Sequence, residues 1–154
     1  MSTIRTALSA LAALALLSTT AFAQTTVTDA WVRGTVAQQK ATGLFAQITS
    51  AQGGRLVSVS SPVAGVVEIH EMKMEGDVMR MRAVSDLALP AGKAVALKPG
   101  GYHVMLLDLK QALKAGDTVP VTLVVEGADK KRESIEIKAA VRTAAAAPAH
   151  EHKH

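Results

Sequence analysis

The sequence predicts an all-β fold, a sandwich or barrel formed by one domain. Short runs rich in Val, Ile, Leu and Thr recur from Val27 onward, separated by clusters of Gly, Pro, Asp and Ser. No segment beyond residue 23 keeps the period of an amphipathic helix. Of the 154 residues, 49% are hydrophobic but only 3% are aromatic, so aliphatic side chains must fill the core.

The sequence predicts three strands in the first part of the domain. Residues 27–36 carry the only tryptophan, Trp31, which we expect in the core. Residues 43–50 run into a turn that contains Gly-Gly. Residues 55–60 form the third strand, which ends before Pro62 because proline has no N–H for a strand ladder.

A hairpin and three further strands follow. Residues 66–74 and 78–84 flank a Glu-Gly-Asp turn, and residues 87–90 and 94–97 are short β-prone runs. Residues 103–109 begin after a Pro-Gly-Gly turn, and their alternate side chains share one face of a strand.

For the last part of the chain, the sequence predicts two strands and a tail. Residues 109–116 predict a short helical turn or a loop, and residues 118–126 alternate as a strand. Residues 133–141 predict the last strand, which we expect at a sheet edge because its outward positions are charged. Residues 143–154 are rich in Ala and His and predict a flexible, disordered tail, so the β domain spans residues 24–142.

Residues 1–23 have the features of an export signal. Arg5 supplies a basic start, residues 7–17 are apolar, and Ala21-Phe22-Ala23 is an A-x-A cleavage site. The apolar run is too short for a membrane span, although a retained N-terminal anchor is the alternative. We expect cleavage after Ala23, a periplasmic location in a Gram-negative source, and no membrane span afterwards.

Composition excludes several classes of function. The absence of Cys excludes disulfides, thiolate metal sites and blue-copper ligation. Removal of Arg5 with the signal leaves 16 basic against 13 acidic residues, so the formal charge falls from +4 to +3. This small excess is scattered and not interleaved with aromatic residues, which argues against nucleic-acid binding.

Histidine and methionine are clustered in the sequence. The only histidines before the tail are His70 and His103. His103 and Met105 alternate on a predicted strand, so they share a face. After Met1, every methionine falls between His70 and Met105: Met72, Met74, Met79, Met81 and Met105.

The turn of the predicted hairpin decides which of these side chains are paired. A Glu75-Gly76 turn places Met72 opposite Met79 and His70 opposite Met81. A Gly76-Asp77 turn instead pairs Met74 with Met79 and Met72 with Met81. A three-residue loop without a bulge would send the sulfur atoms to the face away from His70.

Two imidazoles and two thioethers form a neutral, soft ligand set that suits Cu(I) better than Zn(II). Packing is the alternative explanation, because a single Met on a sheet commonly fills a core and a single His commonly has a structural hydrogen bond. The joint occurrence of His70-Glu71-Met72, His103-Val104-Met105 and a Met-Arg-Met unit favours a metal site.

The order of these residues resembles the motif of the periplasmic copper chaperone family PCu(A)C. Ten residues separate His70 from Met81, twenty-one separate Met81 from His103, and one separates His103 from Met105. The resemblance covers residues 27–127. Its flanking segments are Asp29-Ala30-Trp31-Val32-Arg33, Ala41-Thr42-Gly43, Ser61-Pro62-Val63-Ala64, Glu68-Ile69-His70-Glu71-Met72 and Gly100-Gly101-Tyr102-His103-Val104-Met105-Leu106.

The resemblance implies a cupredoxin-like Greek-key sandwich or barrel that binds Cu(I) through His70, Met81, His103 and Met105. Met72 matches a family position near the site and is an additional candidate ligand. The tail resembles His-rich extensions associated with Cu(II). Its candidate ligands are His150, His152 and His154, and a weak generic metal-binding tract or a solvated chain end is the alternative.

The leading hypothesis is a monomeric copper chaperone, not an enzyme, that delivers Cu(I) to a respiratory oxidase centre of the CuA type or to another copper carrier. A copper sequestration or resistance protein without a dedicated recipient needs the same ligands and remains the alternative. A copper redox protein is disfavoured because no Cys is present. A purely structural exported domain would bind no metal.

Overall fold

The computed structural model describes residues 24–143 and confirms the all-β class. The described residues contain strands and no helix, so none of them forms a helix long and apolar enough to cross a membrane. The strands are β1 (Thr25–Arg33), β2 (Ala41–Ser50), β3 (Gly54–Ser60), β4 (Ala64–Glu75), β5 (Val78–Val84), β6 (Leu87–Leu89), β7 (Ala94–Leu97), β8 (His103–Leu109), β9 (Thr118–Gly127) and β10 (Arg132–Arg142).

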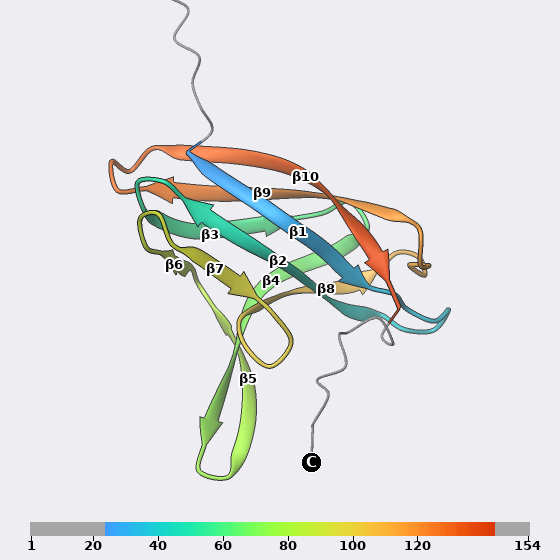
Figure 1. The fold of residues 1–154 in the computed structure, drawn as a ribbon. Coiled ribbons are helices and arrows are strands. Elements are labelled where there is room, and N and C mark those ends of the chain that lie inside the picture. Colours follow the sequence, from blue (N-terminus) through green and yellow to red (C-terminus); the bar gives the residue numbers. More distant parts are fainter. Residues whose placement is uncertain (1–23, 144–154) are drawn as a thin grey trace, which may run out of the picture.

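These strands form one sheet that curls around a common core, as the cupredoxin-like prediction requires (Figure 1). The strand order is β5-β4-β8-β2-β1-β10-β9-β3-β6, and β7 also pairs with β2. β1 and β10 are parallel, whereas every other pairing is antiparallel. β4, β8 and β2 therefore lie side by side and present one continuous outer face.

The core is aliphatic, as the low aromatic content predicts. Leu44, Val104 and Leu123 are completely buried and come from three different strands of the described chain. The expectation for Trp31 was wrong. Trp31 is only half-buried and lies on the outer face, where its ring packs against Phe45 with the centroids 4.5 Å apart.

The predicted edge position of the last strand was also wrong. β10 lies inside the sheet, between β1 and β9, and β5 and β6 form the two ends. Its charged positions alternate with buried or half-buried ones, because one face of the strand points to solvent. Such alternation indicates an exposed face and does not distinguish an edge strand from an interior one. The segment between β8 and β9 is a loop.

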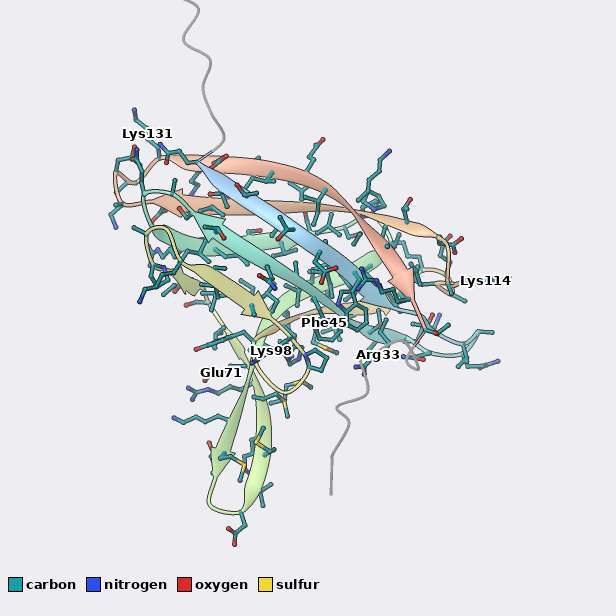
Figure 2. All side chains as sticks on the ribbon, in the orientation of Figure 1. Arg33, Phe45, Glu71, Lys98, Lys114 and Lys131 are labelled. Atoms are coloured by element: carbon teal, nitrogen blue, oxygen red, sulfur yellow. The ribbon has the colours of Figure 1, made fainter. Side chains whose placement is uncertain are left out.

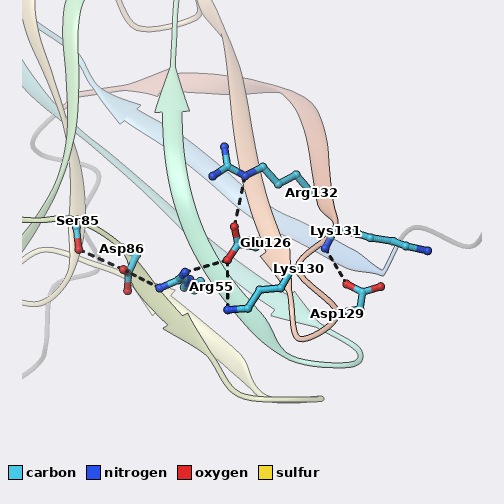
Figure 3. A network of polar contacts seen from close by, with 8 residues as sticks. All are labelled: Arg55, Ser85, Asp86, Glu126, Asp129, Lys130, Lys131 and Arg132. Carbon is cyan, nitrogen blue, oxygen red and sulfur yellow. Dashed lines mark hydrogen bonds and ion pairs between the residues drawn. The ribbon is translucent and has the colours of Figure 1, made fainter.

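A network of hydrogen bonds and ion pairs connects the strands at the β3 end of the sheet (Figure 3). Glu126 accepts hydrogen bonds from Arg55 at 2.8 Å and from Arg132 at 3.4 Å, and Arg55 also reaches Asp86 at 3.4 Å. The hydrogen bond from Arg55 is the main reason that the pKa of Glu126 lies below its ordinary value. The network links β3, β9 and β10 and, through Asp86, the segment between β5 and β6.

The end of β4 and most of β5 form a two-stranded ribbon, residues 71–82, that extends away from the body (Figure 1). β8 pairs with β4 only as far as His70, so beyond that residue the two strands pair only with each other. Gly76 has a φ of 64° in the turn, a conformation that glycine adopts at little cost.

Candidate metal centre

His103 and Met81 make the central contact of the site. His103 begins β8 and is 7% exposed, and its Nε2 atom lies 3.1 Å from the Sδ atom of Met81. Its Nδ1 atom lies 3.0 Å from the carbonyl oxygen of Gly101. Because only an N–H can satisfy that carbonyl, the neutral ring carries its lone pair on Nε2. Two lone pairs therefore converge without a proton between them, which is an arrangement that a cation would stabilise.

His70 lies beside His103 on the neighbouring strand. The two residues are paired in the β4–β8 ladder, and their ring centroids are 5.8 Å apart. The Nε2–H of His70 donates to Glu68, whose Oε2 atom is 2.7 Å away. The Nδ1 atom is buried and has no hydrogen-bond partner. A buried lone pair without a donor fits a metal ligand whose other nitrogen is held by a carboxylate.

The thioethers of the predicted set lie on the same face. Met72 pairs with Met81 across the ribbon, and Met105 follows His103 by two residues on β8. Met72, Met81, His103 and Met105 all line one cavity of about 310 Å³. His70 is not among the lining residues and adjoins the group through the His103 ring.

The ribbon adopts the second of the two predicted registers. Met72 pairs with Met81 and Met74 with Met79, around a Gly76–Asp77 turn. His70 consequently pairs with Ala83 and not with Met81. None of the five methionines of the described chain belongs to the buried core, so core packing does not explain them.

Two residues that contact the site were not predicted from the sequence to do so. Glu68 holds His70, and its signal was the Glu-x-His spacing, which places both side chains on one face of β4. Phe45 forms part of the cavity wall, with its ring centroid 6.4 Å from that of His103. A Cβ atom on Gly43 would lie 2.8 Å from Phe45 Cζ, so this glycine leaves room for the ring. Nothing in the linear sequence indicated that contact.

The opposite face of the ribbon is charged. Glu71 forms an ion pair with Arg82 across the two strands, and this hydrogen bond holds the pKa of Glu71 below its ordinary value. A hydrogen bond to Glu71 raises the pKa of Tyr102, the residue before His103. The charged face thus connects the ribbon with the loop that leads into β8.

The donors gathered here are soft ones. Within residues 24–143, no three His, Cys, Asp or Glu side chains gather in a way that could hold a metal ion. The group at the base of the ribbon instead combines imidazole nitrogens with thioether sulfurs, a set typical of sites for Cu(I). His150, His152 and His154 lie outside the described residues.

The fold and the soft ligand group describe a β domain with a candidate metal centre, and the sequence comparison specifies the family. Residues 25–141 match the family model described as "Putative lipoprotein LpqE-like", and the chain belongs to this LpqE-like family. A relative from Leifsonia xyli subsp. xyli, "Putative lipoprotein Lxx21020", is 34% identical over 63% of this chain. "Uncharacterized protein RP573" from Rickettsia prowazekii is 34% identical over 56% of it. The matches span 59% and 47%, about half, of these two relatives.

Solved structures of PCuAC domains share the fold. "Apo PCuAC domain from PmoF1" matches with a TM-score of 0.64 and 27% identity, over 79% of this chain and 95% of that one. The Cu(I) form of DR1885 from Deinococcus radiodurans matches with a TM-score of 0.61 and 27% identity, over 82% and 83%. The copper-bound PCuAC domain from PmoF2 is 24% identical with a TM-score of 0.63, over 79% and 94%, and supports the fold alone.

Proposed function

We propose that this protein is an exported copper chaperone that holds Cu(I) through His70, Met81, His103 and Met105. The observation that carries the proposal is the convergence of the Nε2 lone pair of His103 and the sulfur of Met81, 3.1 Å apart. The Nδ1 atom of His70 is buried without a hydrogen-bond partner, and the His70 ring centroid lies 5.8 Å from that of His103, so we propose this atom as the second nitrogen ligand. The similarity to the Cu(I) form of DR1885 supports the same choice of ion.

Thioether ligands favour Cu(I) for a physical reason. They are soft and neutral, and they carry no proton that must leave before the metal binds. The backbone carbonyl of Gly101 and the carboxylate of Glu68 fix the orientation of the two imidazoles. Met72, which pairs with Met81 and lines the same cavity, is a further candidate ligand.

The openness of the site favours delivery of the ion over permanent storage. Met81 is 49% exposed and lies on the ribbon, so a ligand from a partner can approach the metal without displacing the core. We propose that the recipient is a copper centre of a respiratory oxidase or another copper carrier. The site holds its ion for transfer, and no catalytic role is proposed for it.

The proposal also assigns roles to the N-terminal segment and to the C-terminal tail. Residues 1–23 act as a cleaved signal that directs the chain to the periplasm, and residues 24–142 form the copper domain. His150, His152 and His154 in the tail form an accessory site that captures Cu(II).

The binding test is competition for Cu(I) with a chromophoric chelator. The chain from Gln24 is expected to bind one Cu(I) tightly, and the chain shortened at Arg142 should keep that site. His103→Ala together with Met105→Ala should abolish it. An unchanged affinity in this double variant, or a site lost with the tail alone, would contradict the assignment.

A second test separates delivery from sequestration. Loss of a chaperone under copper limitation should leave an oxidase without its copper, which is measured as reduced oxidase activity and copper content. Loss of a buffer should cause only sensitivity to excess copper. The exposed ligand Met81 favours the first outcome.

A further inference from the structure

The tip of the ribbon carries a second pair of methionines that the proposed copper site does not use. Met74 and Met79 are directly paired across β4 and β5, next to the turn at the end of the ribbon. Directly opposed side chains on two strands have their Cβ atoms about 4.5–5.5 Å apart, close enough for both sulfurs to contact one ion. Sulfur atoms line the ribbon along its length (Figure 2).

Packing does not account for this outer pair. Met74 is 56% exposed and Met79 is 45% exposed, and neither contributes to the aliphatic core of the described chain. β8 reaches only to His70, so no third strand of the described chain flanks the outer pair. Two large apolar side chains left in solvent add little to stability, so packing within the described chain does not account for their position on the ribbon.

The outer pair is aligned with the proposed copper site. Met74 lies two residues beyond Met72 on β4, and Met79 lies two residues before Met81 on β5. Side chains two apart share a face and are separated by about 7 Å along the strand. The opposite face carries ion pairs between Glu75 and Arg80 and between Glu71 and Arg82. The ribbon therefore has one charged face and one thioether face that ends at the cavity.

We propose that Met74 and Met79 form an outer site for a soft monovalent cation, where Cu(I) enters and leaves the protein. This inference rests on the proposed function of the inner site. The outer site is weaker because it offers two thioethers and no imidazole, which leaves coordination positions for a donor from a partner. Cu(I) keeps its oxidation state throughout, and ligand exchange between the two methionine pairs requires no proton transfer.

The test is a titration of the full chain from Gln24 with Ag(I), a soft monovalent ion that is not redox active here, in chloride-free buffer. NMR signals of ¹³C-labelled methionine methyl groups report each sulfur separately, so Ag(I) bound by the tail is not mistaken for Ag(I) bound by a methionine. We expect the signals of Met81 and Met105 to shift with the first equivalent. Those of Met74 and Met79 should shift only beyond it.

The variant Met74→Leu with Met79→Leu removes both sulfurs and keeps side chains of similar size. It should retain the first equivalent, lose the later binding step, and release Cu(I) to a chelator more slowly than the wild type. Val78→Leu, at an exposed position on the charged face of the ribbon, is the matched control and should leave binding and release unchanged.

The outcomes separate this inference from the proposed function. If only the inner methionines respond at every Ag(I) ratio, the outer site is wrong and the inner site stands. If no methionine responds, the proposed function is wrong as well. If Met74 and Met79 respond first, the outer pair binds the ion but the order of the two sites is overturned.

Discussion

The body of the sheet and the methionine ribbon use apolar side chains in opposite ways. In the body, Leu, Val and Ile from both halves of the sheet are buried around one core, and none of the described methionines contributes to it. In the ribbon, thioethers line one face of two strands that pair only with each other at the tip. The buried core and the exposed thioether face of the ribbon are thus different regions, so a substitution in one of them should leave the other largely unchanged.

Leu44→Ala should have the largest effect on the body. Leu44 is completely buried on β2, so truncation should lower the free energy of unfolding by about 2.7–5 kcal/mol. Urea denaturation measures the loss, and Cu(I) affinity of the folded protein should stay close to that of the wild type. A loss of affinity in the folded variant would show that core and site are not separable.

Glu68→Ala should have the next largest effect, and it should act on the site. The carboxylate of Glu68 holds the Nε2–H of His70, and removal of such an outer-shell partner typically lowers metal affinity by about 10–100-fold. Glu68→Gln should lose less because its amide oxygen still accepts the hydrogen bond. Chelator competition measures both variants, and equal losses would contradict the positioning role of Glu68.

Glu126→Gln should change the acid sensitivity of the body. Hydrogen bonding to Arg55 holds the folded pKa of Glu126 below its ordinary 4.5, so the unfolded chain binds this proton more readily. The carboxylate therefore contributes stability above pH 4.5 and loses that contribution as pH falls through the folded pKa. The variant should be less stable near neutral pH and should lose less stability between neutral pH and acid.

The ribbon supplies the control for this prediction. Glu75→Gln removes an exposed ion pair with Arg80, and solvent screens such pairs strongly. The urea denaturation midpoint of this variant at neutral pH should be close to that of the wild type. A larger loss of stability with Glu75→Gln than with Glu126→Gln at neutral pH would reverse the assignment of structural charge to the body.

Met79→Ala should have the smallest effect on stability. Met79 is exposed on the ribbon, and surface substitutions of this kind usually change stability by less than about 0.5 kcal/mol. Thermal or urea unfolding measures the change, and a loss comparable to that of Leu44→Ala would mean that the ribbon supports the body after all.

The sequence predicted the strands well because alternation and turn residues are local signals. The turn of the ribbon limited its register to two main alternatives, and the structure has the one that pairs Met72 with Met81. The position of β10 was not predictable in this way. Its partner β1 lies at the other end of the chain, and parallel pairing between distant segments leaves no local signal.

The candidate site was partly accessible from the sequence for the same reason. His103 and Met105 share a face by alternation alone, whereas the contact of His103 with Met81 depends on β4 and β8 being neighbours. We expected Trp31 in the core because large aromatic side chains are commonly buried. In the structure, the pairing of β1 with β2 is irregular between Thr28 and Trp31, and the Trp31 ring lies on the outer face against Phe45.

X-ray absorption spectroscopy of the full chain from Gln24, loaded with one equivalent of Cu(I), tests copper binding by Met81 and Met105 directly. We expect a copper environment of two sulfur and two nitrogen scatterers. The sulfur contribution should fall when Met81 and Met105 are replaced by Leu. A spectrum with nitrogen and oxygen scatterers only would contradict the claim that the methionines at the base of the ribbon bind copper.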